Sequence, residues 1–109
     1  MTYKNHSSRK RFGQHWLKDQ GILDQIVNAA KLNSDDCVLE IGPGKGALTE
    51  KLIESQARFI QAIELDSDLI VGLNKRFSHQ NKFSLREGDI LSAPLKAGNG
   101  QIINKVVAN

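Results

Sequence analysis

The stretch EIGPGKGALTE, from Glu40 to Glu50, carries three glycines at alternate positions between a short apolar run and a helical pattern. Glycine allows the backbone to turn sharply and to approach a ligand closely. A buried strand, a glycine-rich loop and a helix in this order are typical of α/β domains that hold a nucleotide-like cofactor at the loop. This stretch therefore predicts the class of fold, and it leaves open which ligand the loop binds.

The rest of the chain alternates strands and helices in the same way. Apolar periodicity predicts helices at 19–31, where Asp19 is the cap, at 47–55 and at Ser67–Phe77. It predicts strands at Cys37–Ile41, 59–63, 83–86 and Lys105–Ala108, with a loop at 91–100. This alternation indicates βαβ units and a parallel sheet. In such a sheet a ligand is expected at the edge where the strands end.

The charge of the chain is unevenly distributed. Residues 1–18 hold five of the 15 basic residues and no acid, so the remainder holds ten basic and twelve acidic residues. We therefore divide the chain into a basic N-terminal arm and a cofactor-binding domain, 19–109. In the arm, Arg9, Lys10 and Arg11 lead into RFGQHWL, which adds aromatic side chains. Basic and aromatic residues together are typical of a surface that binds RNA, and also of an arm that docks on its own domain.

The composition excludes several classes of protein. No apolar run is long enough to span a membrane, and the basic N-terminus lacks the apolar segment of a secretory signal. Cys37 is the only cysteine, so no internal disulfide can form. We expect a cytoplasmic protein in which Cys37 is a core residue rather than a nucleophile. No metal site is expected.

Two phosphate-bearing ligands fit the loop to different degrees. A nucleoside triphosphate site needs Ser or Thr after Gly-Lys, and Lys45 is followed by glycine and alanine instead. A dinucleotide is harder to dismiss, because Gly42, Gly44 and Ala47 satisfy its glycine fingerprint. Glu64 also lies twenty residues after Gly44, where an acid would hold ribose hydroxyls.

Three features favour a cofactor without phosphates. Glu40, beside the loop, suits a ligand with an ammonium group. Gly46 extends the glycine pattern, which we expect to bring more of the backbone close to the ligand. Asp89, after the third strand, can accept a hydrogen bond from an adenine amine while Glu64 holds the ribose. An amino-acid end, a ribose and an adenine together indicate S-adenosylmethionine.

Five segments in order also resemble a known family: RKRFGQHWL, VLEIGPGKGALTE, AIELDSDL, EGDIL and KVVAN. They are similar to motifs of the ribosomal RNA adenine dimethyltransferases, above all the small-subunit branch. The resemblance implies a Rossmann-like class I methyltransferase fold and dimethylation of N6 on two adjacent adenines. It further implies small-subunit rRNA in a pre-ribosomal particle as partner, and a monomer when full-length. The chain would then be truncated after the start of the fourth strand, able to bind cofactor but inactive alone.

The same resemblance assigns roles to individual residues. His15 and Leu17 would border the methionine end of the cofactor, and Asn109 would border it too while acting as the catalytic residue that begins the family's Asn-(Leu/Ile)-Pro-Tyr motif. The other expected cofactor-binding residues are Gly42, Gly44, Glu64 and Asp89, and the expected RNA-binding residues are Arg9, Lys10 and Arg11.

Three alternatives stay open. The large-subunit rRNA methyltransferases that confer antibiotic resistance share most of these motifs. A non-catalytic RNA-binding or transcription-factor relative could keep the same fold. An NAD-dependent dehydrogenase is the weakest alternative.

Overall fold

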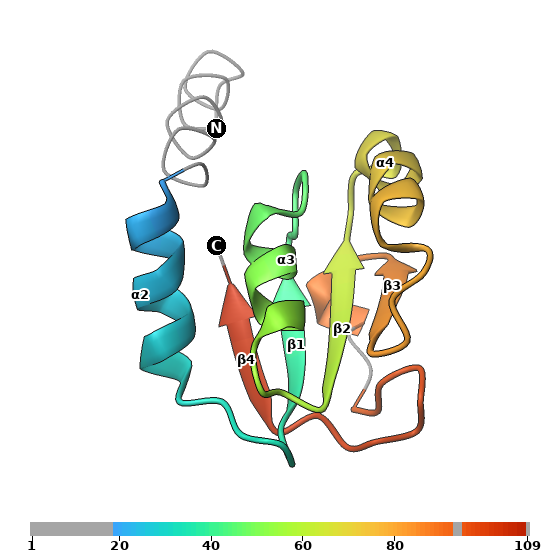
Figure 1. Ribbon diagram of the computed structural model, residues 1–109. Coiled ribbons are helices and arrows are strands. Elements are labelled where there is room, and N and C mark those ends of the chain that lie inside the picture. Colours follow the sequence, from blue (N-terminus) through green and yellow to red (C-terminus); the bar gives the residue numbers. More distant parts are fainter. Residues whose placement is uncertain (1–18, 93–94, 109) are drawn as a thin grey trace.

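The computed structural model describes residues 19–92 and 95–108 and contains one parallel sheet (Figure 1). Its four strands stand in the order β3-β2-β1-β4. Their bounds are Cys37–Ile41 for β1, Phe59–Glu64 for β2, Phe83–Glu87 for β3 and Lys105–Ala108 for β4. The parallel pairing confirms the predicted fold class. The fourth strand has β1 as its only neighbour among the described strands.

Three helices accompany the sheet: α2 (Gln20–Ala30), α3 (Ala47–Glu54) and α4 (Ser67–Phe77). Asp19 caps α2 as predicted, since its carboxylate accepts a hydrogen bond from the amide of Ile22 at 3.2 Å. The predicted loop at 91–100 is only partly correct, because a short 3-10 helix, η1, occupies Ile90–Ser92. An isolated antiparallel bridge also joins Lys96 and Ile102. None of the helices in the described part of the chain is long and apolar enough to cross a bilayer.

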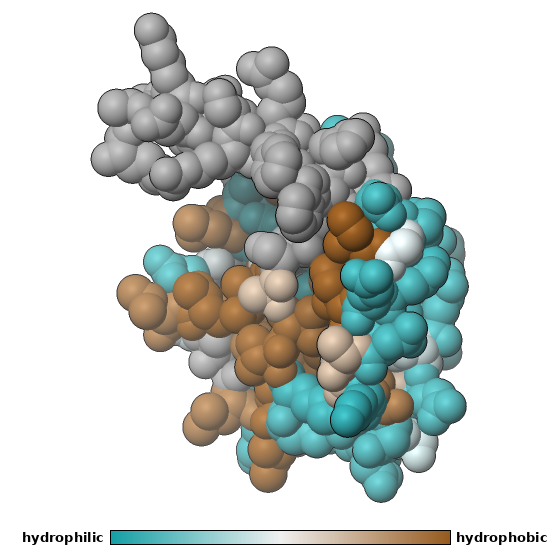
Figure 2. All heavy atoms as spheres, turned by 90° about the vertical axis from the view of Figure 1, so that its left-hand side faces the viewer, coloured by the Kyte–Doolittle hydropathy of each residue, from teal (hydrophilic) through white to brown (hydrophobic). Residues whose placement is uncertain are grey.

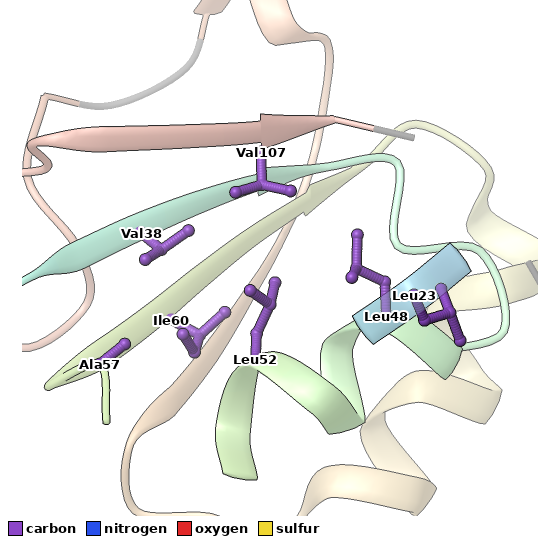
Figure 3. Close-up of a cluster of buried hydrophobic side chains, with 7 residues drawn as sticks. All are labelled: Leu23, Val38, Leu48, Leu52, Ala57, Ile60 and Val107. Carbon is purple, nitrogen blue, oxygen red and sulfur yellow. The ribbon is translucent and has the colours of Figure 1, made fainter. Parts of the chain in front are cut away.

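The main core lies between the sheet and the helices α2 and α3 (Figure 3). Leu23, Leu48 and Leu52 project from the helices onto the sheet and are fully buried. Val38 and Ile60, which are paired in register on β1 and β2, face them from the sheet. Burial of each such side chain contributes about 1.5–3 kcal/mol. This packing fixes α3 above β1, and with it the loop that joins them.

The opposite face of the sheet is covered differently. Cys37, Phe59 and Ala97 form a second buried cluster there, which confirms Cys37 as a core residue. Burial also raises the pKa of its thiol.

Seen from the side of α2 and β4, hydrophobic residues gather on one half of the surface and hydrophilic residues on the other (Figure 2). The most exposed large apolar side chains follow β3: Leu91 is 92% exposed and Leu95 is 86% exposed.

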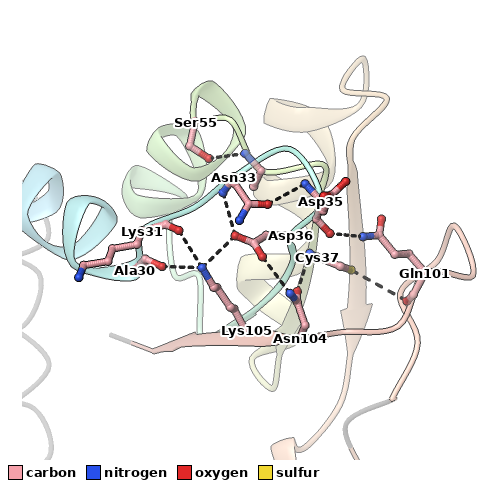
Figure 4. A network of polar contacts seen from close by, with 11 residues as sticks. Ala30, Lys31, Asn33, Asp35, Asp36, Cys37, Ser55, Gln101, Asn104 and Lys105 are labelled. Atoms are coloured by element: carbon pink, nitrogen blue, oxygen red, sulfur yellow. Dashed lines mark hydrogen bonds and ion pairs between the residues drawn. The ribbon is translucent and has the colours of Figure 1, made fainter.

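A polar network joins β4 to the start of β1 (Figure 4). Lys105 forms an ion pair with Asp36 at 2.9 Å and donates to two carbonyls at the end of α2. Asn104 donates to Asp36 and accepts from the amide of Cys37, both at 2.8 Å. The Lys105 side chain, followed by the Asn33 amide and Asn104, lowers the pKa of Asp36 to about 2. These contacts fix the register of β4 on the sheet.

Candidate cofactor site

The glycine loop and the end of β2 are bound together at the carboxyl edge of the sheet. Glu64 accepts hydrogen bonds from the amide of Gly44 at 3.1 Å and from the amide of Asp66 at 3.0 Å. The amide of Gly42 donates to the carbonyl of Ile63 at 3.0 Å. Adjacent parallel strands end side by side, which is why residues twenty or more positions apart meet here. The structure therefore brings together Gly42, Gly44 and Glu64, as the sequence predicts.

Gly42 and Gly44 leave an open space above the loop. Both adopt left-handed backbone conformations, with φ of +67° and +61°. A Cβ added to either would meet no atom within 4 Å. These two positions therefore form a cradle without side chains, as a closely approaching ligand requires.

Gly46 has a different role from the one predicted. Its φ is +97°, and an added Cβ would lie 2.6 Å from Cε2 of Phe77 on α4. Gly46 is itself buried. It is therefore required for packing of the loop on α4, which corrects the expectation that it brings the backbone to the ligand.

Two residues at the end of α4, Arg76 and Phe77, hold the second half of the loop, and we call them the α4 brace. Nη1 of Arg76 donates to the carbonyl of Lys45 at 2.7 Å. Nη2 of the same side chain forms an ion pair with Glu50 of α3. The Phe77 ring fills the space over Gly46 and packs against Phe83, with ring centroids 5.2 Å apart. The brace thus links the loop to two helices.

Glu40 lies beneath the loop rather than at its surface. Its side chain is fully buried and accepts a hydrogen bond from Oγ1 of Thr49 on α3 at 2.5 Å. Burial, opposed by the Thr49 hydrogen bond and assisted by the nearby Glu64, raises the pKa of Glu40 to about 7. Its other oxygen, Oε2, is buried without a partner in the described chain. That this carboxylate suits a ligand with an ammonium group stays a prediction.

Asp89 lies at the same edge, after β3, and is exposed. Its Oδ1 accepts a hydrogen bond from the amide of Leu91 at 2.9 Å, which shapes the turn into η1.

Two residues near this edge were not predicted from the sequence. Leu65, directly after Glu64, is 69% exposed here. The other is Thr49, whose hydrogen bond to Glu40 depends on how α3 packs on β1. An apolar residue immediately after a strand end was the available signal for Leu65.

The hydrogen bonds of this edge limit its chemistry. The amides of Gly42, Gly44 and Gly46 are occupied by Ile63, Glu64 and Pro43 respectively. A phosphate binds at such loops through free amide donors, and these three are not free. The carboxylate of Glu64 accepts two hydrogen bonds and has capacity for about two more. Glu64 therefore suits a ligand that donates hydroxyl groups at this edge.

Six predicted site residues lie outside the described residues: Arg9, Lys10, Arg11, His15, Leu17 and Asn109. Their roles stay predictions. In the ranges that the structure does describe, no three His, Cys, Asp or Glu side chains are grouped to hold a metal ion.

The fold and the carboxyl edge define a Rossmann-like class I methyltransferase domain. The comparison with sequence families gives a more particular assignment. Residues 5–106 match the family described as ribosomal RNA adenine dimethylase, and the chain belongs to that family.

Relatives and solved structures agree with this assignment. A protein of Prochlorococcus marinus (strain NATL2A) named ribosomal RNA small subunit methyltransferase A is 86% identical over 104 residues, which is 95% of this chain and 36% of that protein. The crystal structure of a dimethyladenosine transferase from Plasmodium falciparum is 37% identical with a TM-score of 0.71, over 84% of this chain and 32% of that one. The crystal structure of the 23S rRNA methyltransferase ErmE is 32% identical with a TM-score of 0.66, over 72% of this chain and 33% of that one. The chain thus spans about a third of the length of these proteins.

Proposed function

We propose that this chain is the S-adenosylmethionine-binding part of an enzyme that dimethylates adjacent adenines in small-subunit rRNA. The arrangement of the glycine loop and Glu64 is the observation that carries the proposal. Gly42 and Gly44 leave a cradle, and Glu64 offers further acceptor capacity beside it. Glu64 implies a ligand with hydroxyl groups, and the match to the ribosomal RNA adenine dimethylase family favours S-adenosylmethionine over NAD.

The cofactor, when bound, supplies a methyl group on a positively charged sulfur. Glu64 would accept hydrogen bonds from the ribose hydroxyls, and Asp89 from the adenine amine. Gly42 and Gly44 would border the cofactor, with His15 and Leu17 near its methionine end. Glu40 lies two residues before Gly42, has a buried oxygen without a partner in the described chain, and would give the loop negative character when ionised.

Asn109 is the proposed catalytic residue. An adenine amine is a poor nucleophile because its lone pair is delocalised into the ring. An asparagine side-chain oxygen that accepts a hydrogen bond from the amine would orient it toward the methyl group, and orientation supplies much of the catalysis in such reactions. The base must leave its stack to reach this position. We place this enzyme in the cytoplasm, as a monomer acting on a pre-ribosomal particle.

Methylation of large-subunit rRNA is the second candidate, because ErmE shares the fold at 32% identity. The small-subunit reaction is favoured because the P. marinus protein, at 86% identity, is named for the small subunit. A chimera of these 109 residues with the remainder of that protein would decide between them. We expect it to transfer radiolabelled methyl groups to unmethylated small subunits, and transfer to large subunits alone would refute the proposal. The 109-residue chain by itself should transfer none.

Cofactor choice is tested separately by calorimetric titration of the 109-residue chain. We expect S-adenosylmethionine to bind and NAD not to bind at the same concentration. Tighter binding of NAD would show that the loop has been assigned to the wrong ligand.

A further inference from the structure

A pocket of about 470 Å³ lies at the opposite end of the sheet from the glycine loop. Its polar lining consists of Arg58, His79, Gln80, Asn81, Lys82 and Asn99. Arg58 directly precedes β2, and Lys82 directly precedes β3. Because neighbouring parallel strands begin at the same edge, these two cations lie side by side at the amino edge of the sheet.

The lining is entirely basic or neutral within the described ranges. It combines an arginine, a lysine, a histidine and three amides, and it contains no acid. This contrasts with the chain from residue 19 onward, where twelve acids outnumber ten basic residues. The three ion pairs found in the described part of the chain involve Lys51, Arg76 and Lys105, and none involves the pocket. The pocket therefore concentrates positive charge on an otherwise slightly acidic domain.

Lys82 is the most informative residue of the pocket. It is half-buried, and burial lowers the pKa of its ammonium group. Nζ donates to the carbonyl of Ser55 at 3.0 Å, which holds the group in place without neutralising its charge. An ammonium group has three donors, so others remain for a ligand. A partly desolvated cation without an acidic partner is stabilised when an anion binds beside it.

We propose that this pocket binds phosphodiester groups of the RNA substrate, far from the nucleotide that is methylated. The amides and cations of the lining are donors suited to phosphate oxygens. β2 has six residues, which separates the two edges by about 20 Å. A phosphate in the pocket therefore belongs to a different part of the RNA from the target adenines. The pocket orients a large folded substrate, an inference that rests on the proposed function for the choice of RNA.

The test compares two charge-matched variants of the full 109-residue chain. The pocket variant is Arg58→Ala with Lys82→Ala, and the control variant is Lys75→Ala with Arg86→Ala, two exposed residues outside the lining. Binding to small-subunit rRNA is measured over a range of salt concentrations. We expect the pocket variant to lower the slope of log affinity against log salt by about 1.4–1.8, since each phosphate contact contributes roughly 0.7–0.9. The control variant should change it by much less.

An equal change in both variants, or no change in the pocket variant, would overturn the proposal. So would displacement of RNA by inorganic phosphate at submillimolar concentration, because the pocket would then be a small-anion site. If the pocket variant does not fold, Arg58→Glu decides, since Arg58 is exposed and its side chain makes no hydrogen bond to the described chain. S-adenosylmethionine binding is titrated in each variant and should be unchanged. If the unaltered chain does not bind S-adenosylmethionine, the cofactor assignment is refuted. The comparison of salt slopes between the pocket variant and the control variant stays valid in that case.

Discussion

Replacement of Gly46 by alanine should destabilise the domain far more than the same replacement at Gly44. Both glycines lie in the same loop and have left-handed backbone conformations. They differ in their surroundings, because the added Cβ meets Phe77 at 2.6 Å in one case and no atom within 4 Å in the other. The pair therefore separates the cost of backbone strain from the cost of steric overlap.

The magnitudes follow from these two terms. An L-residue in the left-handed region costs about 1–2 kcal/mol, and this applies to both variants. Overpacking against a fixed side chain adds about 1–3 kcal/mol, and this applies to Gly46→Ala alone. The Phe77 ring cannot turn away freely, since it is 6% exposed and packed against Phe83. We expect Gly46→Ala to lower the free energy of unfolding by about 2–5 kcal/mol in total.

Urea unfolding of the two variants measures the difference. With a slope of about 1–3 kcal/mol per molar urea, the midpoints of the two variants should differ by roughly 1 M. In a Phe77→Leu background, which removes the ring, the cost of Gly46→Ala should fall to that of Gly44→Ala. Equal losses from both single replacements would refute the assignment of Gly46 to packing. So would a cost of Gly46→Ala that is unchanged by Phe77→Leu.

Three further predictions concern the site and the arm. Glu64→Ala should weaken S-adenosylmethionine binding by about 1.5–3 kcal/mol in a calorimetric titration, because the ribose loses a charged acceptor, and Asp68→Ala on the exposed start of α4 should not. Folding raises the pKa of Glu40 from 4.5 to about 7, so the free energy of unfolding should fall as the pH rises from 4.5 to 7. A Glu40→Gln variant lacks this group, and an equally steep fall in its free energy of unfolding would contradict the prediction. Replacement of Arg9, Lys10 and Arg11 together by alanine should lower the salt slope of RNA binding by up to about three units. Altered cofactor affinity with an unchanged slope would instead indicate that the arm docks on its own domain.

The strands and helices were predictable because each carries a local signal. The alternation of apolar runs and caps gave β1, α4 and β4 with their observed bounds. The short helix η1 was not predictable in this way, since three residues are too few for a periodic pattern. The position of β4 beside β1 depends on contacts such as Lys105 with Asp36, which no local pattern contains.

The site was predictable where the chemistry depends on the strand ends alone. Gly42, Gly44 and Glu64 meet because adjacent parallel strands end together. The burial of Glu40 without a partner for Oε2, and the packing role of Gly46, were not predicted, for a different reason. Glu40 pairs in register with Val107, and both side chains point to the face of the sheet that packs on α2 and α3. The sequence alone does not show to which face the side chain of Glu40 points. The neighbour of Gly46 belongs to a helix about thirty residues later.

The strand order also determines which strand pairs are complete at each stage of synthesis. β1, β2 and β3 are consecutive in the chain and adjacent in the sheet, so each can pair soon after it leaves the ribosome. β4 crosses back to the opposite side of β1 and can join only when the intervening segment has been made. The cradle and Glu64 are therefore synthesised before Asn109, at the ends of β1 and β2, which pair with each other. Translation therefore completes the residues proposed to bind the cofactor before it reaches the residue proposed to hold the target base.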